Sequence, residues 1–598
     1  MDYTLQKILF PRPEICMEEG LYYHRDEKCY LDAENGKLIF SNRGSAVFDT
    51  YFNSFSIGKW KKYTKMSDLS LRIHISGSFM VSIYNLEMIN GGIVSKVIDE
   101  RIYAAEQRTS FTFSYAGFSQ KGIHCFKILS LEDNSVFYGG EYFTECNEDI
   151  SLRDVVLAIN ICTFKREEYL YRNVRLLLDN VVNNISNSLY QKVYIYITDN
   201  AQTVDESMLA DSHVFVTKQN AFGSAGGFTR GEISILENAE KTRATHMIFM
   251  DDDIVIDPEV LNRTSAILQW IKDEYQEAWL GGANLTLGFS FMQAESGGVI
   301  ENGAYKMLKL SLNEAQPYNV LFNEIEEGAK INAWWYCCVP LSTIGLDNLP
   351  YPMYFHCDDM EYSMRLCPKL LLFNGVAVWH EDFAYKTINY YFDTRNREIL
   401  IALHFKEVAN RKKCKKRVIR KVGKLILCYR YQAAHEVMDS IADFVKTQNW
   451  FNDDLDRNKF CELKENATKA YPVSSLPMQM DYGQYLRELA HNDSRFHKLL
   501  RFVTINGWLL PAKRDKVVRG EDARVYNFYR AKNVLNYYAA SNTGFITTKN
   551  YAQAIKAGIR LISILIMIDL NYKSAQKNII DSFHNVTSRE FWGNRYGI

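Results

Sequence analysis

HMIFMDDD, residues 246 to 253, is the stretch that decides the fold. Four apolar residues, Met247 to Met250, are followed directly by three carboxylates. A short apolar run bounded by polar residues indicates a buried strand. Adjacent carboxylates repel one another, so a chain that keeps Asp251 to Asp253 after such a strand offsets the repulsion with a cation or with hydrogen-bond donors. The alternative, a solvated acidic turn, fits the apolar flanks less well.

Three comparable apolar runs precede this stretch. They are VVLAINICTF (155–164), KVYIYITD (192–199) and SHVFVTKQ (212–219). A helical pattern, Glu167 to Asn180, separates the first two, and buried runs that alternate with amphipathic segments are typical of a parallel α/β sheet. Ligands bind to such sheets at the carboxyl ends of the strands. The polar residues that we expect to converge there are Arg166, Asn200, Asn220 and Asp251 to Asp253.

Asp251 and Asp253 have the spacing of two ligands for one divalent cation. In an extended chain residues i and i+2 face the same way, whereas Asp252 points elsewhere. His380 follows the apolar strand pattern LLLFNGVAVW (370–379) and is a candidate third ligand; a histidine satisfied within the core is the alternative. Carboxylate and imidazole ligands together suit Mn²⁺ or Mg²⁺, and the nitrogen ligand favours Mn²⁺.

A glycine-rich segment, NAFGSAGGFTRG (220–231), leads from a predicted strand into a helix. Glycine allows a backbone to approach a ligand closely, and a helix N-terminus favours negative charge. The segment has neither the GK[ST] of a Walker loop nor a GxGxxG pattern. It therefore indicates a nucleotide ligand while disfavouring ATPases and dinucleotide enzymes.

Candidate acceptor-side residues follow further along the chain. Trp334 and Trp335, in NAWWYCC (332–338), present flat faces suited to stacking on sugar rings, with core packing as the alternative. Of the acid pair Asp358 and Asp359, one carboxylate can act as a general base and the other can accept hydrogen bonds from hydroxyls; a helix N-cap is the alternative. A nucleotide loop, a metal pair, an acid pair and a histidine together indicate nucleotide-sugar glycosyl transfer.

The segments on either side of this region have other patterns. Residues 1–150 alternate apolar and polar positions, as in Leu71, Ile73 and Ile75, and contain glycine and asparagine turns. These features predict an antiparallel β-sandwich, the architecture of many carbohydrate-binding modules. Residues 401–598 have helical periodicity and predict a mainly helical region.

Two features of the C-terminal region bear on membranes. RKKCKKRVIRKVGK (411–424) contains nine basic residues and no acidic one, which suits an anionic membrane surface; a solvated helix face is the alternative. LISILIMI (561–568) is eight residues long, short of the ~20 needed to span a bilayer. It predicts a buried or an interfacial helix.

The composition limits the class of protein. A length of 598 residues exceeds one hydrophobic core, 47% hydrophobic residues exclude wholesale disorder, and a net charge of −1 argues against nucleic acid as a partner. The 12 cysteines have no CxxC or zinc-like spacing, and residues 1–20 lack the pattern of a signal peptide. We therefore expect a cytoplasmic protein, peripheral on the inner face of the plasma membrane, with homo-oligomerisation left open.

The order of the motifs resembles that of the GT-A fold, family 2 inverting glycosyltransferases. The motifs are TFKR (163–166), TDN (198–200), NAFGSAGGFTRG, FMDDDI (249–254), NAWWYCC, HCDDME (356–361), VWHEDF (378–383) and YFDTRNR (391–397). Within that family the chain looks most like the bacterial polymerising galactofuranosyltransferases of cell-wall galactan synthesis. Those enzymes have an N-terminal β-sandwich, a central Rossmann-like GT-A domain and a helical C-terminal region. The corresponding domains here are 1–150, 151–400 and 401–598.

The resemblance also implies roles for individual residues. Asp359 would be the catalytic base, and the metal would be held by Asp251, Asp253 and His380. The UDP part of the donor would contact Arg166, Asn200, Asn220, Asp251 and Asp252. The acceptor pocket would be lined by Glu295, Trp334, Trp335 and Asp358.

Three positions depart from the family pattern. Cys357 stands where the family has Trp, Asp393 where it has His, and Asn200 where it has Gln. The first two fall on the acceptor side, so acceptor identity and polymerisation stay open. We expect transfer of galactofuranose from UDP-galactofuranose to a hydroxyl of a lipid-linked or cell-surface glycan. The alternatives are transfer of another UDP-sugar such as galactopyranose or glucose, a non-catalytic glycan-binding scaffold, and a nucleotide-sugar hydrolase.

Overall fold

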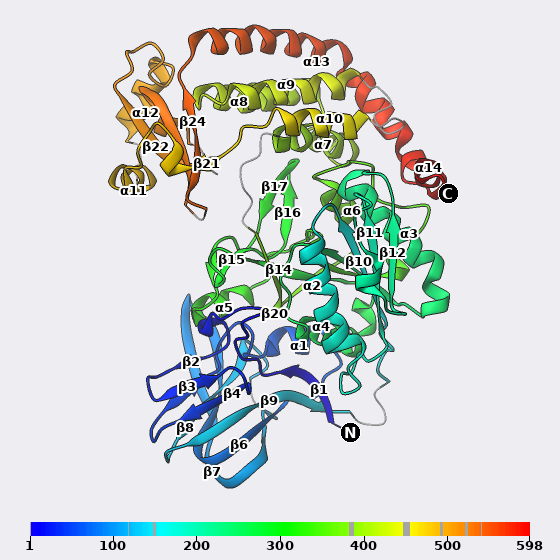
Figure 1. Ribbon diagram of the computed structural model, residues 1–598, viewed down its shortest axis with the longest axis vertical. Helices are drawn as coiled ribbons and strands as arrows, with labels where there is room; N and C mark the ends of the chain where they lie inside the picture. The colour runs from blue at the N-terminus through cyan, green and yellow to red at the C-terminus, as the bar shows by residue number, and fades with distance from the viewer. Residues whose placement is uncertain are drawn as a thin grey trace.

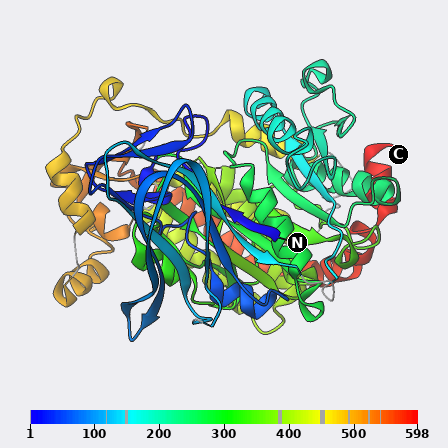
Figure 2. The same cartoon turned by 90° about the horizontal axis from the view of Figure 1, so that it is seen from below.

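A computed structural model gives the architecture of the chain as a mixed α/β, multidomain protein (Figure 1). The N-terminal sheet lies at one end of the long axis and the C-terminal helices lie at the other, with the α/β region between them. Figure 2 shows the same arrangement from below, with the N-terminal sheet nearest the viewer. The structure describes residues 2–117, 119–146, 151–381, 388–446, 455–490, 494–520, 524–539 and 541–598.

The N-terminal region is built on one long hairpin. Strand β6 (Ser70–Ile89) turns through Asn90 and Gly91, both with positive φ, into β7 (Gly92–Ser114). This is the asparagine–glycine turn that suits a two-residue hairpin connection. The other strands are β1 (Asp2–Lys7), β2 (His24–Arg25), β3 (Cys29–Asp32), β4 (Lys37–Phe40), β5 (Ser45–Val47), β8 (Ile123–Ser130) and β9 (Ser135–Glu145).

The antiparallel prediction for this region is confirmed, whereas the packing of two sheets into a sandwich stays a prediction. All nine strands belong to one hydrogen-bonded sheet. β6 pairs with β7 along one edge, and along its other edge it pairs first with β9 and then with β8. The sheet therefore divides along β6, because a strand of 20 residues is long enough to serve two partners in succession.

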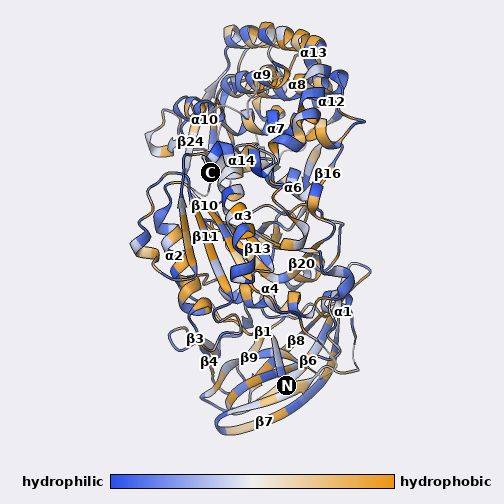
Figure 3. Ribbon diagram, turned by 90° about the vertical axis from the view of Figure 1, so that its right-hand side faces the viewer, coloured by the Kyte–Doolittle hydropathy of each residue, from blue (hydrophilic) through white to orange (hydrophobic). Residues whose placement is uncertain are grey.

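The central sheet begins with four parallel strands whose positions match the sequence prediction. They are β10 (Leu157–Thr163), β11 (Val193–Asp199), β12 (Val214–Lys218) and β13 (His246–Asp251). Their order in the sheet is β12-β11-β10-β13, so the direction of winding reverses between β10 and β13. Ligands of doubly wound sheets bind at this reversal, outside the carboxyl ends of the strands. Figure 3 shows the apolar colouring of β10 and β11 in the core.

The rest of the sheet is mixed. Its strands are β14 (Trp279–Thr286), β15 (Met292–Glu295), β18 (Leu312–Asn313), β19 (Tyr336–Pro340) and β20 (Leu370–His380). β19 pairs antiparallel with both β13 and β14, and β20 runs parallel to β14. A separate hairpin, β16 (Gly298–Glu301) and β17 (Ala304–Met307), projects toward the C-terminal helices (Figure 1). The helices of this region are α1 (Ile57–Tyr63), α2 (Glu167–Leu177), α3 (Gly223–Thr242), α4 (Glu259–Trp270), α5 (Pro317–Asn323) and α6 (Asp358–Leu366).

The glycine-rich segment forms the first turns of α3 rather than an open loop. A Cβ at Gly227 would lie 2.1 Å from Cys162 Sγ, and one at Gly231 would lie 2.0 Å from Asn160 Oδ1. These glycines therefore allow α3 to pack closely on β10. The sequence prediction of a close approach was correct, but the partner of these two residues is the neighbouring strand.

The C-terminal region contains long helices and a small sheet. The helices are α7 (Ile388–His404), α8 (Arg411–Leu427), α9 (Tyr431–Lys446), α10 (Leu455–Glu465), α11 (Tyr482–Ala490), α12 (Arg495–Val503), α13 (Tyr551–Val586) and α14 (Arg589–Tyr596). The expected domain boundary at residue 400 falls within α7. A four-stranded sheet, which the helical prediction missed, contains β21 (Tyr471–Pro472), β22 (Arg514–Arg519), β23 (Ala531–Tyr538) and β24 (Thr543–Thr548).

Helix α13 is longer and more apolar than the run LISILIMI suggested. It has 36 residues and includes a window of mean hydropathy 1.5, of which 17% is buried. By length and composition it is the one helix in the described part of the chain that could cross a membrane. One face packs on α9 and α8 through residues such as Ile564 and Ile568. The opposite face exposes Ile559 and Leu570.

Candidate functional site

Three predicted metal ligands meet at the edge where the sheet reverses. Asp251 is the last residue of β13, Asp253 follows it, and His380 ends β20. The His380 Nε2 atom lies 3.4 Å from Asp253 Oδ1 and 3.8 Å from Asp251 Oδ2. One ligand atom from each of the three residues falls within 4.8 Å of the others. The i, i+2 spacing therefore places both carboxylates toward the histidine, as the sequence predicted.

The orientation of the His380 ring suits metal ligation. Its Nδ1 atom lies 2.7 Å from the backbone oxygen of Glu381, which can only accept a hydrogen bond. With Nδ1 at this carbonyl, the ring turns Nε2 toward Asp251 and Asp253, from where it could ligate a cation shared with them. Arg166, at the N-cap of α2, donates to Asp253 on the other side of the pair.

Burial makes this edge a poor place for uncompensated negative charge. Desolvation raises the pKa of Asp251, with Asp358 adding to the shift and His380 opposing it. Desolvation likewise raises the pKa of Asp252 to about 6, although Thr163 donates to it over 2.6 Å. Carboxylates in such a position are stabilised in their charged form by a cation. This chemistry fits the predicted divalent metal, which stays a prediction.

The acid pair begins α6, as the helical pattern after it predicted. Asp358 Oδ2 accepts a hydrogen bond of 2.8 Å from Ser224 of α3, so this carboxylate is fixed toward the glycine-rich turn. Asp359 accepts from its own helix at the Met360 amide. Burial, followed by the charges of Asp358 and Glu295, raises the pKa of Asp359 well above its usual range. A raised pKa makes a carboxylate a better proton acceptor, which suits Asp359 to act as a base.

Glu295, at the end of β15, completes a cluster of carboxylates. It is 5% exposed, and burial raises its pKa to about 7. Tyr305 of β17 donates to it over 3.1 Å. The charges of Glu295 and Asp359 both act on Tyr305, raising its pKa, which places all three side chains in one neighbourhood. An acid pair beside a tyrosine and a glutamate with a raised pKa can orient and deprotonate a hydroxyl.

The two asparagines predicted to contact the nucleotide lie at the same edge of the sheet but differ in exposure. Asn200 follows β11 and is 5% exposed, and its amide donates to Gly223 O over 3.0 Å. The Asn220 side chain is exposed and accepts a 3.3 Å hydrogen bond from Gln202. In this structure Asn200 supports the glycine-rich turn, whereas Asn220 is accessible at its rim.

The two tryptophans do not present open faces. The Trp334 ring stacks on Phe249 with centroids 4.4 Å apart and an angle of 7° between the planes. Trp335 is 5% exposed and donates to the Gly282 carbonyl. Both rings thus pack in the core and offer no open stacking platform, and Trp334 also contacts Phe228 and Tyr362. Contact of either residue with an acceptor stays a prediction.

Two of the unusual positions have clear structural roles. Cys357 is buried and takes a left-handed conformation just before α6. Asp393 forms ion pairs of 2.6 Å with Arg397 and with Lys421. Desolvation alone would raise the pKa of Asp393, but the charges of Lys421 and then Arg397 hold that pKa below its usual range. Asp382 and Phe383 of the VWHEDF motif lie outside the described residues.

Sequence reasoning missed several partners of the predicted residues. Ser224 and Thr163 contact acidic residues that are 134 and 89 positions away, and Tyr305 contacts Glu295 ten positions before it. The position of Ser224 in the glycine-rich segment was the available signal, since a hydroxyl at a helix start is a common ligand contact. No pattern in the sequence pairs Tyr305 with Glu295.

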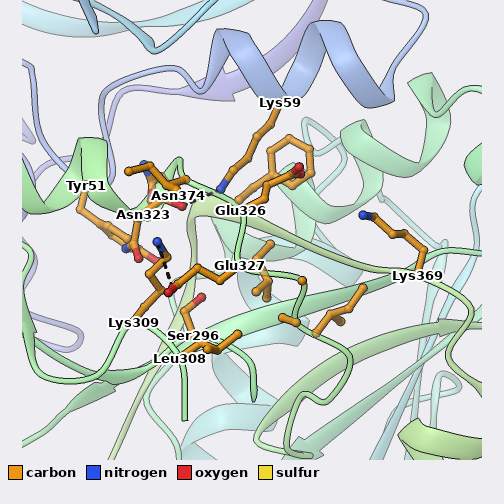
Figure 4. A pocket seen from close by; sticks show the side chains of 16 residues that line it. Tyr51, Lys59, Ser296, Leu308, Lys309, Asn323, Glu326, Glu327, Lys369 and Asn374 are labelled. Carbon is orange, nitrogen blue, oxygen red and sulfur yellow. Dashed lines mark hydrogen bonds and ion pairs between the residues drawn. The ribbon is translucent and has the colours of Figure 1, made fainter. Parts of the chain in front are cut away.

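A partly open pocket is lined by other residues than the carboxylate cluster (Figure 4). Its lining includes two buried lysines, Lys59 and Lys309, and Lys309 pairs with Glu327 over 3.2 Å. Its volume is about 50 Å³. A volume of this size admits at least one water molecule.

Comparison with known proteins places the chain near one group of enzymes. Residues 5–144 match the family model described as Galactofuranosyltransferase 2 N-terminal. The chain is 23% identical over 434 residues to galactofuranosyltransferase GlfT2 of Mycolicibacterium smegmatis, covering 67% of this chain and 65% of that protein. It is 23% identical over 431 residues to GlfT2 of Mycobacterium tuberculosis, covering 67% and 66%. The match thus spans slightly less than two thirds of the relatives' length.

Solved structures give only remote similarity. The xylohexaose complex of the CBM22-1 and GH10 modules of Clostridium thermocellum xylanase 10B has a TM-score of 0.18 at 12% identity, covering 33% of this chain and 38% of that one. The Gap123 complex of Streptococcus agalactiae has a TM-score of 0.16 at 15% identity, covering 46% and 86%. These scores are too low to assign a fold. The family model and the two sequence relatives show a GlfT2-like chain, similar over 67% of its length to the mycobacterial galactofuranosyltransferases.

Proposed function

We propose that this protein is a metal-dependent inverting glycosyltransferase that moves galactofuranose from UDP-galactofuranose to a hydroxyl of a lipid-linked or cell-surface glycan. The observation that carries the proposal is the meeting of Asp251, Asp253 and His380 within 4.8 Å at the reversal of the sheet. Similarity to GlfT2 supports the donor sugar. The strand order and the carboxylates after β13 support a GT-A, family 2 classification.

Residues at the strand ends would hold the donor. A bound Mn²⁺ or Mg²⁺ would neutralise charge on the departing diphosphate. Asp251, Asp253 and His380 offer it two oxygens and one nitrogen. Arg166 already pairs with Asp253 and is placed to pair with phosphate oxygens once that carboxylate is engaged elsewhere. Asn200, Asn220 and Asp252 surround the same edge and would contact the uridine or ribose.

The acid pair would handle the acceptor. Asp359 takes the proton of the acceptor hydroxyl while the hydroxyl oxygen attacks the anomeric carbon. The attack comes from the side opposite the diphosphate, so the configuration is inverted. Ser224 fixes Asp358, whose remaining oxygen can accept a bond from a neighbouring hydroxyl of the sugar. Glu295 and Tyr305 lie beside Asp359 and would orient the acceptor in the same way.

The donor panel is the direct test of this function. Purified protein, Mn²⁺ and a galactose-terminated acceptor are incubated with UDP-galactofuranose, UDP-galactopyranose or UDP-glucose, and the products are weighed by mass spectrometry. We expect addition of hexose with UDP-galactofuranose alone. Addition from UDP-galactopyranose or UDP-glucose would replace the donor assignment, and no addition from any donor would favour a glycan-binding scaffold.

We also propose peripheral attachment to an anionic membrane, consistent with a cytoplasmic location. Three basic residues of α8 are already paired within the protein: Lys415 with Asp569, Arg417 with Glu398 and Lys421 with Asp393. Other basic residues of α8, which include Arg411, Lys412, Lys416 and Arg420, are exposed. The Lys415–Asp569 pair joins α8 to α13, and α13 exposes aliphatic side chains such as Ile559 and Leu570. Basic and aliphatic side chains together suit an anionic lipid surface.

Liposome flotation tests this attachment. Reversing the charges of Arg411, Lys412, Lys416 and Arg420 to Glu should release the protein from vesicles of phosphatidylglycerol and phosphatidylcholine at low salt. The matched control reverses four exposed basic residues of the N-terminal region, Lys96, Arg108, Lys121 and Lys127. Equal flotation of the α8 variant and the wild type would contradict this surface.

A further inference from the structure

The loop that leads into the acid pair has an unusual backbone. Tyr354, His356 and Cys357 have φ values of 55°, 67° and 66°, and Asp358 follows them as the first residue of α6. Non-glycine residues seldom adopt this left-handed region, and they do so only where the surroundings impose it. Some feature outside the loop must therefore hold residues 353–357 in place.

One side chain reaches three carbonyls of that loop. Asn396, in α7, is 0% exposed, and its Nδ2 atom donates to Met353 O and Phe355 O over 2.8 Å and to His356 O over 2.9 Å. Arg395 fixes the amide orientation by donating to Asn396 Oδ1 over 3.0 Å. Arg395 itself is anchored by an ion pair with Asp456, in which both side chains are 1% exposed.

The other side of the same loop rests on the glycine-rich turn. A Cβ at Gly223 would lie 1.9 Å from Tyr354 O, and Ser224 donates to that oxygen over 3.3 Å as well as to Asp358. The loop is thus held between α3 on the proposed donor side and Asn396 on the other. A small displacement of this loop would move both carboxylates of the acid pair relative to the donor.

We propose that Asn396 is a positioning residue that holds the loop 353–357, with its left-handed Tyr354, His356 and Cys357, and thereby aligns Asp359 with the donor sugar. This inference rests on the proposed transferase function. Asn396 acts through the loop, so its loss should lower kcat and leave the KM for UDP-galactofuranose nearly unchanged. A misplacement of about 1 Å can lower a rate by roughly 10²-fold, and we expect a loss of that order for Asn396→Ala.

A matched variant separates positioning from general destabilisation. Asn536, in β23, is also 0% exposed, donates to Val534 O, Phe545 O and Thr547, and accepts a bond from Arg430. Asn536→Ala removes the same kind of amide network far from the acid pair. It should lower thermal stability as Asn396→Ala does, with little effect on kcat.

Glycine provides the rescue experiment. Glycine adopts positive φ without steric cost, so His356→Gly should restore part of the lost kcat in the Asn396→Ala background and change the wild type little. Wild-type kcat in Asn396→Ala, an equal kcat loss in Asn536→Ala, or no recovery with His356→Gly would each overturn the inference. Amide hydrogen exchange gives a readout without turnover: exchange at 353–359 should rise in Asn396→Ala and stay unchanged in β10. If exchange at 353–359 is faster in Asn396→Ala than in the wild type but the wild type transfers no sugar, the proposed function fails and the role of Asn396 in holding the loop stands.

Discussion

Replacing Asp359 by Asn is the most informative single change at the acid pair. The amide keeps the shape of the carboxylate and can still accept the Met360 N–H bond at the start of α6, so the fold should persist. Only the basicity is lost. Removal of a general base lowers rates by about 10²–10⁴-fold. At about 1.36 kcal/mol per tenfold, this raises the barrier by roughly 3–5 kcal/mol.

The pH dependence gives the same prediction a second, independent measure. Burial and the charges of Asp358 and Glu295 raise the pKa of Asp359, so its basic form grows as the pH increases. The acid limb of kcat/KM should therefore lie above the usual range of a carboxyl group, with activity rising toward neutral or alkaline pH. Asp358→Asn removes a neighbouring negative charge, and its acid limb should move to lower pH.

Transfer is measured as UDP release at saturating acceptor, and donor affinity is measured by calorimetry with UDP and Mn²⁺. Asp359→Asn should lose turnover and keep UDP affinity, whereas Asp358→Asn should mainly raise the KM for the acceptor. Near-wild-type turnover in Asp359→Asn would refute the assignment of the base. Loss of UDP binding in that variant would place Asp359 on the nucleotide side and refute it equally.

Three further predictions concern the metal, the packing of α3 and a buried acid. Asp253→Ala should abolish Mn²⁺-dependent UDP binding in calorimetry while circular dichroism stays unchanged; unaltered affinity would remove Asp253 from the ligand set. Gly231→Ala places a Cβ 2.0 Å from Asn160 Oδ1 and should destabilise the protein by about 1–3 kcal/mol in denaturant unfolding. A Cβ at Gly423 in α8 would have no atom within 4 Å, so Gly423→Ala should stabilise the protein slightly. Equal changes in stability for Gly231→Ala and Gly423→Ala would contradict the close packing of α3 on β10. Burial raises the pKa of Glu232 to about 8, so the folded protein holds this proton more tightly than the unfolded chain does. The resulting stabilisation is complete below the pKa of Glu232 in the unfolded chain and is lost as the pH rises to about 8. Wild-type stability should fall by up to about 1.4 kcal/mol per pH unit between roughly pH 5 and 8 relative to Glu232→Gln, and parallel curves would contradict the shift.

The positions of the main strands follow from local sequence pattern. β13 and the strands before it in the sheet are short apolar runs that end in polar residues, and both ends of such runs are visible in the sequence. The division of the N-terminal sheet along β6 was not predictable, because alternation indicates which face is buried and not which strands pair. The strands β22 to β24 were missed because polar residues such as Lys516 and Asn536 interrupt their alternation.

The site shows a similar division. Asp251 and Asp253 are two residues apart and on one strand end, so their convergence is a local property of the chain, and the position of His380 after a strand completes it. Ser224 and Asp358 are 134 residues apart, and Asn396 reaches across 40 residues to His356, so these contacts depend on tertiary packing. The burial of the tryptophan faces was not predictable, because sequence does not reveal that Phe249 stacks on Trp334.

The central claim is tested most directly by counting products with and without metal. UDP and hexose-extended acceptor are quantified together after incubation with UDP-galactofuranose, in the presence of Mn²⁺, of EDTA, and of Mn²⁺ without acceptor. The account predicts one UDP per added hexose with Mn²⁺ and acceptor, and neither product with EDTA or without acceptor. Equal UDP release without acceptor would identify a hydrolase, and undiminished transfer in EDTA would contradict the role of Asp251, Asp253 and His380 as metal ligands.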